Sequence, residues 1–393
     1  MSFRHERGPV SQSSDSFVIE NARVVLPDTV VESGWAAVAG GRIAEVGAGR
    51  APERGVDFGG DLLTPGLIEL HTDHLEQHLK PRPKVQWPPL AAVIAYDAQI
   101  VASGITTVFD SLRMGNDIDY APLDAELWEA VAAIDAAHNE GLLRAEHRTH
   151  LRCEICAVDA VAQTETFLSR HAVDLISLMD HTPGARQFRD IEVWRTYYGG
   201  KNQRSAQDLD RLIESRVALF AANYARHRAA LLELAKARGV VVASHDDATP
   251  EHVAESVANG VAIAEFPTTA EAARASHAAG IAVLMGAPNM VRGGSHSGNV
   301  AAESLARDGV LDILSSDYVP AALIMGAFEL ARRIEGYGLP AALRTVTLNP
   351  ARAAGLHDRG EIAAGKRADL IRIRVAQDLP VVREVYRGGR RVI

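Results

Sequence analysis

Short apolar segments that end in a side chain able to bind a metal recur along this sequence. The first runs from Thr64 to Glu76, TPGLIELHTDHLE, where one residue separates His71 from Asp73. In an extended strand, residues i and i+2 project from the same face, so this spacing would place His71 and Asp73 together at a strand end. Two such residues can also simply hydrogen-bond each other, so a single pair does not establish a metal site.

The recurrence of the pattern favours a metal site. Later apolar runs end, in order, at Glu154 (LLRAEHRTHLRCE), His181 (VDLISLMDH), His245 (VVVASH), Glu265 (VAIAE) and Asp317 (VLDILSSD). Imidazole nitrogens and carboxylate oxygens are common ligands of zinc and other divalent metals. Because the ligands of one site must meet in space, the series also constrains the fold.

Strand-like and helix-like segments alternate through the middle of the chain. Ala-rich amphipathic stretches separate strand-like segments at about 66–73, 104–110, 142–154, 173–181, 239–245, 261–266, 280–286 and 310–317. Eight such strands predict an α/β fold of the (β/α)8 TIM-like barrel type, in which functional residues lie at the carboxyl ends of the strands. A doubly wound open sheet is the alternative, but it would gather them at one switch point.

Both ends of the chain are rich in short strand-like runs with Gly turns, such as FVIENARVV and GEIAAGKRADLIRI. We therefore expect a small β-sandwich domain built from both chain ends beside the barrel. The expected boundaries are 1–64 for the N-terminal part of the sandwich, with 1–16 frayed, 65–348 for the metal-dependent barrel and 349–393 for the C-terminal part of the sandwich.

One long excursion interrupts the alternation, from Thr182 to about Gly239. Segments of this size above a catalytic face are often lids or substrate clamps, and the alternative is a helical hairpin with no direct role. The basic residues Arg186, Arg189, Arg195 and Lys201 favour the clamp.

Composition narrows the class of partner. The formal net charge of -9 disfavours nucleic acid and anionic membranes as main partners, and 47% apolar residues can supply a large core. No apolar run reaches the length of a membrane span and the polar start lacks a signal-peptide core, so we expect a cytoplasmic protein.

The two cysteines, Cys153 and Cys156, are expected to be reduced structural thiols. Self-association into a homo-oligomer is left open.

The motifs PGLIELHTD, LSSD and GEIAAGKRADL resemble the amidohydrolase superfamily, whose barrels use divalent metals to activate water for hydrolysis. The resemblance covers nearly the whole chain. More narrowly, HTDHLEQH, HLRCE, SLMDHTPG, SHDDATPEH, AEFPTT, GAPNMVRGGSHSGN, LSSDYVP and LNPARAAGL resemble, in the same order, the branch that hydrolyses a phosphonate-bearing ribose 5-triphosphate to the 5-monophosphate and pyrophosphate. The expected partner is thus a small phosphorylated molecule.

The resemblance implies a set of metal ligands. One ion would be held by His71, Asp73 and Asp317 and another by His181 and His245, with Glu154 between them, while Glu265 takes the place of the usual strand-six His. Oxygen donors at Asp73 and Glu265 are compatible with Zn2+, the first choice by resemblance, and with Mn2+ or Fe2+. One or two ions remain open. Glu154 could instead pair with Arg152 or His150, and His181 could cap a helix.

Catalytic and substrate-binding roles follow from the same resemblance. Asp317 is the favoured general base, and His296 is expected to help neutralise the leaving pyrophosphate. A triphosphate also needs cations, and those nearest the expected strand ends or in the adjoining loops are Arg113, Arg152, Arg292, Lys80 and Arg186. Hydrolysis of a cyclic amide or N-acyl group is the alternative activity, and a barrel without catalysis is a further alternative.

Overall fold

The computed structural model describes residues 16–116, 124–188, 190–202, 205–295 and 298–393. The frayed terminus expected for residues 1–16 therefore lies, apart from residue 16, outside the described residues.

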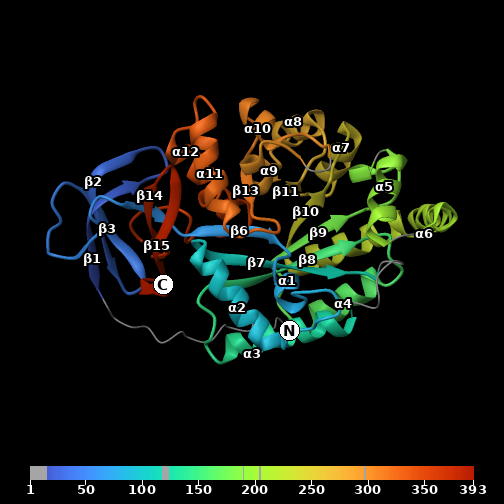
Figure 1. Cartoon of the computed structure of the whole chain (residues 1–393), viewed down its shortest axis with the longest axis horizontal. Helices are drawn as coiled ribbons and strands as arrows, with labels where there is room; N and C mark the ends of the chain where they lie inside the picture. The colour runs from blue at the N-terminus through green and yellow to red at the C-terminus, as the bar shows by residue number, and fades with distance from the viewer. Residues whose placement is uncertain (1–15, 117–123, 189, 203–204, 296–297) are drawn as a thin grey trace.

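Eight parallel strands form the central sheet, and their spatial order follows the order of the chain (Figure 1). They are β6 (Leu67–Thr72), β7 (Ile105–Met114), β8 (Glu146–Glu154), β9 (Leu175–Met179), β10 (Val241–His245), β11 (Ile263–Glu265), β12 (Ala282–Gly286) and β13 (Ile313–Ser315). A parallel bridge between Thr72 and Asp317 brings the last strand back to the first. The predicted (β/α)8 barrel is thus confirmed, and the open doubly wound sheet is excluded.

The seam between β6 and β13 is held largely by side chains. The buried Glu69 carboxylate accepts hydrogen bonds from the backbone N–H groups of His71, at 2.7 Å, and Ser316, at 2.5 Å. Thr72 Oγ1 donates to the carbonyl of Asp317 at 2.7 Å. Because β13 has only three residues, these contacts replace ladder hydrogen bonds that a longer strand would supply.

A layer of apolar side chains fills the barrel below the carboxyl ends of its strands. It contains Ile68, Leu70, Phe109, Leu175, Ala243, Ile263, Leu284 and Ile313, and Ala351 and Leu356 pack on it. Such a layer makes the barrel a solid core rather than a pore, so the polar residues must lie above it, at the strand ends.

Helices cover the outside of the barrel. They are α1 (Leu75–Leu79), α2 (Pro89–Ala102), α3 (Asp124–Asn139), α4 (Ala160–Arg170), α7 (Pro250–Ala258), α8 (Ala270–Ala278), α9 (Ala287–Arg292), α10 (Ala302–Arg307), α11 (Ala322–Arg333), α12 (Leu339–Arg344) and α13 (Leu348–Ala353). Both cysteines are free and buried, and Cys153 packs in an apolar cluster with Phe167 of α4. Burial raises the pKa of the Cys153 thiol to about 12, which keeps it protonated.

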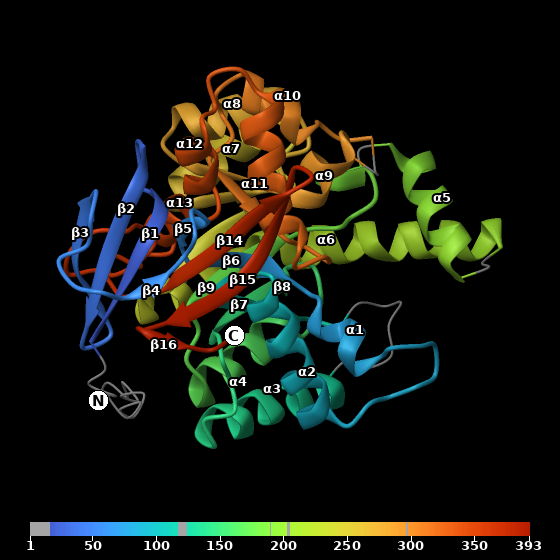
Figure 2. The same cartoon turned by 60° about the vertical axis from the view of Figure 1, so that its left-hand side comes forward.

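The chain ends form a second sheet beside the barrel (Figure 2). Its order is β16-β15-β14-β5-β1-β2-β3, and β4 pairs with β1. The strands are β1 (Phe17–Val25), β2 (Val30–Ala39), β3 (Arg42–Ala48), β4 (Val56–Asp57), β5 (Leu62–Pro65), β14 (Leu370–Ala376), β15 (Leu379–Arg387) and β16 (Arg390–Arg391). The expectation of a small β unit shared by both termini is confirmed, and the antiparallel pairing of β5 with β14 joins the two ends.

The excursion between β9 and β10 projects from the barrel as an arm (Figures 1 and 2). It comprises η1 (Arg186–Phe188), α5 (Ile191–Asn202) and the 33-residue α6 (Ala206–Arg238). Trp194 and Tyr198 of α5 pack against Leu209 and Leu212 of α6. No helix among the described residues is both long enough and apolar enough to cross a membrane.

Candidate functional site

The sequence-predicted metal ligands gather at the carboxyl ends of the barrel strands. Glu154, His245 and Glu265 are the last residues of β8, β10 and β11, and His71 is the last but one of β6. His181 lies two positions after the last residue of β9, and Asp317 lies two positions after the last residue of β13. The strand-end pattern in the sequence therefore does place these residues on one rim of the barrel.

His71, His245 and Glu265 form the most deeply buried group of this rim. Glu265 Oε1 lies 3.0 Å from His71 Nδ1, and Glu265 Oε2 lies 3.2 Å from His245 Nδ1. His245 and Glu265 are direct partners in the β10 and β11 ladder, so their side chains share the inner face. Burial alone would raise the pKa of Glu265, but His71, His150 and His245 hold it well below its ordinary value.

Glu154 and His181 form a second group on the same rim. His181 Nδ1 lies 2.5 Å from Glu154 Oε2, and Arg113 Nη2 lies 3.8 Å from the same oxygen. Burial alone would raise the pKa of Glu154, but His181, then Arg113 and Arg216, hold it at about 2. Of the alternatives open for Glu154, pairing with Arg152 or His150 is therefore not what the structure forms.

Asp246 links the two groups, and sequence reasoning missed it. Its Oδ2 lies 3.5 Å from His245 Nε2 and 4.0 Å from His181 Nε2. This oxygen is buried and accepts no hydrogen bond from any residue that the structure describes. The signal was present in the run SHDD, where Asp246 directly follows the strand-end histidine.

The donor set fits a divalent cation. The ligand atoms of His71, His245 and Glu265 all lie within 4.8 Å of one another, and so do those of His181, His245 and Asp246. Both groups combine imidazole nitrogen with carboxylate oxygen, as zinc, manganese and iron sites do. A buried carboxylate oxygen without a hydrogen bond is a further feature that a cation would satisfy.

Asp73 lies apart from these groups. The strand β6 ends at Thr72, so the i, i+2 alternation that would pair Asp73 with His71 does not continue to it. Instead, Asp73 Oδ2 lies 3.5 Å from Arg152 Nη1, in a side chain that is 32% exposed. His71 thus contacts Glu265 and Asp73 contacts Arg152, and the metal-ligand role expected of Asp73 stays a prediction.

Asp317 lies on the rim at the barrel seam. Its backbone has φ of +54°, a conformation that Asp tolerates better than most residues, and its N–H donates to the carbonyl of His71 at 3.2 Å. A Cβ atom added at Gly286 would lie 3.8 Å from Asp317 Oδ2, so this glycine leaves space beside the carboxylate. The position suits a base that meets substrate beside His71.

Arg113 and Arg152 lie side by side beside Glu154. They are direct partners in the parallel ladder of β7 and β8, so both side chains project from the same face. Glu154 follows Arg152 by two positions on β8 and shares that face. Two neighbouring guanidinium groups repel each other, and a multiply charged anion would relieve that repulsion.

The other expected substrate contacts have different outcomes. Arg292, the last residue of α9, is exposed, and Lys80 lies just past α1 and is also exposed. His296 lies outside the described residues. The substrate contacts expected of these three residues therefore stay predictions.

Arg186 is enclosed by protein partners. Its guanidinium pairs with Asp247, with Tyr224 Oη at 2.9 Å and with Glu255 Oε2 at 3.4 Å, and the residue is only 6% exposed. Because Tyr224 belongs to α6 and Glu255 to α7, these bonds connect the arm to the barrel. This arrangement fits a role in holding the arm better than the expected contact with substrate.

Arg195, which had favoured a clamp, forms its ion pairs within the arm. Arg195 pairs with Asp210 and, at 3.3 Å, with Glu192 Oε1, all within α5 and α6. Arg189 and the side chain of Lys201 lie outside what the structure describes.

His150 is a second residue that sequence reasoning did not place in the site. Its ring is fully buried between Leu70 O, 2.9 Å from Nδ1, and the Ser177 hydroxyl, and Nε2 lies 3.7 Å from Glu265 Oε1. Burial lowers the pKa of His150 to about 3, so the ring is neutral and can position Glu265 without adding charge.

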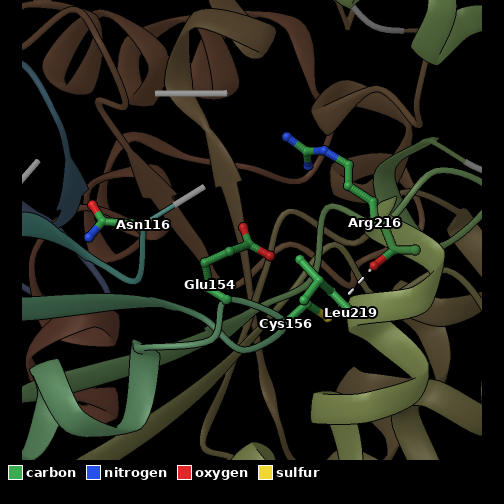
Figure 3. A pocket seen from close by; sticks show the side chains of 7 residues that line it. Asn116, Glu154, Cys156, Arg216 and Leu219 are labelled. Atoms are coloured by element: carbon green, nitrogen blue, oxygen red, sulfur yellow. Dashed lines mark hydrogen bonds between the residues drawn. The ribbon is translucent and has the colours of Figure 1, made fainter. Parts of the chain in front are cut away.

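An open pocket lies beside Glu154 (Figure 3). Its lining residues are Asn116, Glu154, Cys156, Ala157, Thr182, Arg216 and Leu219. Arg216 and Leu219 come from α6, so the arm forms one wall of the pocket and the barrel rim forms the other. The sequence favoured a clamp role for this excursion, but it did not single out Arg216 or Leu219.

Comparisons with known proteins identify relatives. The model of the amidohydrolase family matches residues 226–392. The α-D-ribose 1-methylphosphonate 5-triphosphate diphosphatase of Escherichia coli (strain K12) is 47% identical over 378 residues, which is 95% of this chain and 100% of that protein.

Solved structures with the same fold are more distant in sequence. N-isopropylammelide isopropylaminohydrolase from Burkholderia multivorans has a TM-score of 0.64 and 18% identity, covering 96% of this chain and 98% of its own. N-acetyl-D-glucosamine-6-phosphate deacetylase from Mycobacterium smegmatis has a TM-score of 0.62 and 20% identity, covering 96% of this chain and 100% of its own. At this level of identity, the likeness shows the fold alone.

Proposed function

The chain belongs to the amidohydrolase family, within its branch of α-D-ribose 1-methylphosphonate 5-triphosphate diphosphatases, and we infer from this that it serves phosphonate catabolism as a hydrolase of phosphoanhydride bonds. Its reaction is the cleavage of α-D-ribose 1-methylphosphonate 5-triphosphate to the 5-monophosphate and pyrophosphate. The observation that carries this function is the near full-length identity to the Escherichia coli enzyme, together with a rim of metal-type donors beside paired arginines.

We propose that the metal is held by His71, His181, His245 and Glu265, with Glu154 beside His181, and by Asp246 in addition, while the ligand roles expected of Asp73 and Asp317 stay predictions. A divalent ion bound there would lower the pKa of water toward ~7 and polarise a phosphoryl oxygen. Zinc is the proposed metal by resemblance to the family, and the carboxylates keep manganese and iron as alternatives. The two groups that share His245 support one or two ions.

Asp317 is the proposed general base. It takes the proton of the attacking water and passes it to the oxygen of the departing pyrophosphate, so the carboxylate ends the reaction in its starting form. Its backbone is fixed by His71 and Thr72, which holds the carboxylate at the seam beside His71.

Arg113 and Arg152 are the proposed phosphate contacts. Their planar guanidinium groups can each donate two parallel hydrogen bonds to phosphate oxygens, and their adjacency suits an anion with several negative charges. Arg152 Nε is buried and donates no hydrogen bond within the described residues, so a donor remains for substrate. Lys80, Arg292 and His296 remain proposed contacts of the triphosphate.

We propose attack at the α-phosphorus. Water then bonds to that phosphorus as the bond to the bridging oxygen breaks, and pyrophosphate leaves with that oxygen. Hydrolysis in oxygen-18 water decides the point, because α attack puts the label in the 5-monophosphate and β attack puts it in pyrophosphate.

The function is tested by phosphorus NMR on anaerobically purified protein whose metal content has been measured. We expect at least about one metal per chain, pyrophosphate and 5-monophosphate signals from the triphosphate, and loss of both after chelation. A hydantoin and an N-acyl substrate serve as controls for the alternative amidohydrolase activity. Ring opening of the hydantoin by metal-loaded protein that leaves the triphosphate intact would reject the proposal, and a far lower metal content would indicate a barrel without catalysis.

We propose the cytoplasm as the location of this enzyme. Both cysteines are free although they lie only three positions apart and are buried, as is common in reducing compartments.

A further inference from the structure

We propose that Arg216, on the arm helix α6, binds the polyphosphate of the substrate and of the pyrophosphate product. This inference rests on the proposed function and deepens it, because it gives the arm a direct part in recognising the anion. None of the relatives' names or the family match assigns a role to this residue.

Arg216 connects the arm to the barrel rim. Its Nη1 donates to the carbonyl of His181 at 3.5 Å, and its side chain lines the same pocket as Glu154 and Thr182. Figure 3 shows the side chain extending from α6 into this pocket. A phosphate group that occupies the pocket would therefore lie between Arg216 and the residues at the end of β8.

Two aromatic rings of α5 hold the guanidinium. Its Cζ lies 5.1 Å from the centre of the Tyr198 ring and 5.7 Å from that of Trp194. Trp194 is fully buried, Tyr198 is 6% exposed, and Arg216 itself is 6% exposed. Rings on which the planar group can lie fix its orientation before ligand binds, which reduces the entropy lost on binding.

The charges around the pocket favour an anionic ligand. Arg113 and Arg152 lie on the barrel side of Glu154, and Arg216 approaches from the arm. Glu154 contributes one negative charge, but it already pairs with His181, whereas a triphosphate supplies several. Arg216 lines the pocket from the arm, and Arg113 lies 3.8 Å from Glu154 Oε2 on the barrel side, so cationic groups from two elements face such a ligand.

The test measures the affinity of the metal-loaded enzyme for inorganic pyrophosphate by calorimetry. Arg216→Met keeps a long apolar stem against Trp194 and Tyr198 but removes the charge, and we expect it to weaken pyrophosphate binding about tenfold to hundredfold. The KM for the triphosphate should rise by a similar factor, with a smaller fall in kcat. Metal content and Tm should stay close to those of the unsubstituted enzyme.

Arg211→Met is the matched control. Arg211 lies on the same helix and is 76% exposed, paired at 3.8 Å with Asp208 Oδ1, so pyrophosphate affinity should not change. Unchanged pyrophosphate affinity in folded Arg216→Met would overturn the inference, and so would equal losses in the two variants. If Arg216→Met does not fold, Arg216→Lys decides, with at least a threefold loss expected and none contradicting the proposal.

The outcome is separable from that of the proposed function. If the unsubstituted enzyme fails to cleave the triphosphate, the function is rejected, and pyrophosphate binding still measures the role of Arg216. If it cleaves the triphosphate and Arg216→Met binds pyrophosphate as well as before, only the role of Arg216 is rejected.

Discussion

At the scale of single residues, three positions on the rim share an unusual backbone conformation. Asp246 (φ +57°), Phe266 (φ +53°) and Asp317 (φ +54°) all lie in the left-handed region, and each immediately follows a strand or lies close to its end. Such residues store strain that the surrounding fold must support, and they are concentrated at functional sites. Here the sharp change of direction keeps Asp246 beside His245 instead of continuing out of the barrel.

Replacing Asp246 with Asn tests whether its charge helps to hold the metal. The amide keeps the size of the side chain but removes the negative charge next to His181 and His245. We expect metal affinity and kcat/KM to fall about 10- to 100-fold, as they do when groups close to a metal are changed. Metal titration and steady-state kinetics measure the two effects.

Asp308→Asn is the control for that change, since Asp308 pairs with Arg274 on the surface at 2.7 Å. If Asp246→Asn retained full metal affinity while the control also behaved normally, Asp246 would be a structural residue of the turn and not part of the metal centre.

The strand-end pattern predicted which residues meet, but not how they group. His71, Glu154, His181, His245 and Glu265 could be found because the carboxyl ends of barrel strands share one rim. Which of these residues contact one another depends on the directions of their side chains, and the strand ends are irregular. The i, i+2 alternation of a regular strand does not apply there, and Asp73 contacts Arg152. Arg216 could not be found because nothing in the sequence fixes where a 33-residue helix outside the barrel pattern will pack.

At the scale of elements, the arm is attached to the barrel by a buried network around Arg186. Asp247 forms an ion pair with Arg186 and is fully buried. Its carboxylate also accepts hydrogen bonds from the hydroxyls of Ser244, at 2.6 Å, and Ser256, at 3.1 Å. The network therefore joins η1, β10 and α7 and, through Tyr224, the helix that carries Arg216.

Arg186→Met should reduce stability without removing a substrate contact. Loss of the guanidinium leaves Asp247 as a buried, uncompensated charge, which costs on the order of 3–5 kcal/mol. We expect a lower urea midpoint and Tm, while the KM of the remaining folded enzyme changes less than it does in Arg216→Met. A large rise in KM with unchanged stability would restore Arg186 as a substrate contact.

Arg195→Met provides the comparison within the same arm. Its ion pair with Asp210 is partly exposed, 28% and 54% for the two side chains, so its loss should cost less than about 1 kcal/mol. A similar loss of stability in both variants would mean that burial of the Arg186 network contributes little.

At the scale of the whole molecule, the barrel follows from regular alternation, because each strand pairs with the next one in the chain. The pairing of the two chain ends could also be predicted from the sequence. Both ends carry strand-like patterns, and an isolated hairpin at either end would be only marginally stable. The sequence did not reveal which buried ion pairs connect the helices to the barrel strands.

One such buried ion-pair network lies outside the functional rim, where α2 meets β7 and β8. His147 lies at the centre of this network. Its Nδ1 lies 2.8 Å from Asp110 Oδ2 on β7, and its Nε2 lies 3.3 Å from Asp97 Oδ1 on α2. Tyr96 Oη donates to Asp110 Oδ1 at 2.9 Å, and the backbone N–H groups of Arg144 and Ala145 donate to Asp97 Oδ1, each at 2.9 Å. A protonated His147 thus places one positive charge between two carboxylates that the fold buries together, and Arg144 also pairs with Asp97.

This arrangement predicts that stability falls as the pH rises above neutrality. Burial alone would lower the pKa of His147, but Asp110 and Asp97 raise it to about 9, whereas in the unfolded chain it is ~6.5. Below pH ~6.5 both the folded and the unfolded chain carry the proton on His147, and the stabilisation is complete. Between pH ~6.5 and about 9 only the folded chain carries it, so the free energy of unfolding falls as the pH rises.

Replacing His147 with Gln should therefore destabilise the protein by on the order of 2–3 kcal/mol at pH 6, and the difference should shrink toward pH 10. Urea unfolding of both proteins across this range measures it, with His277→Gln, whose ring is 41% exposed beside Asp312, as a surface control. A difference that stays constant from pH 6 to 10 would mean that His147 is neutral in the fold and that the two carboxylates share their charge with other groups.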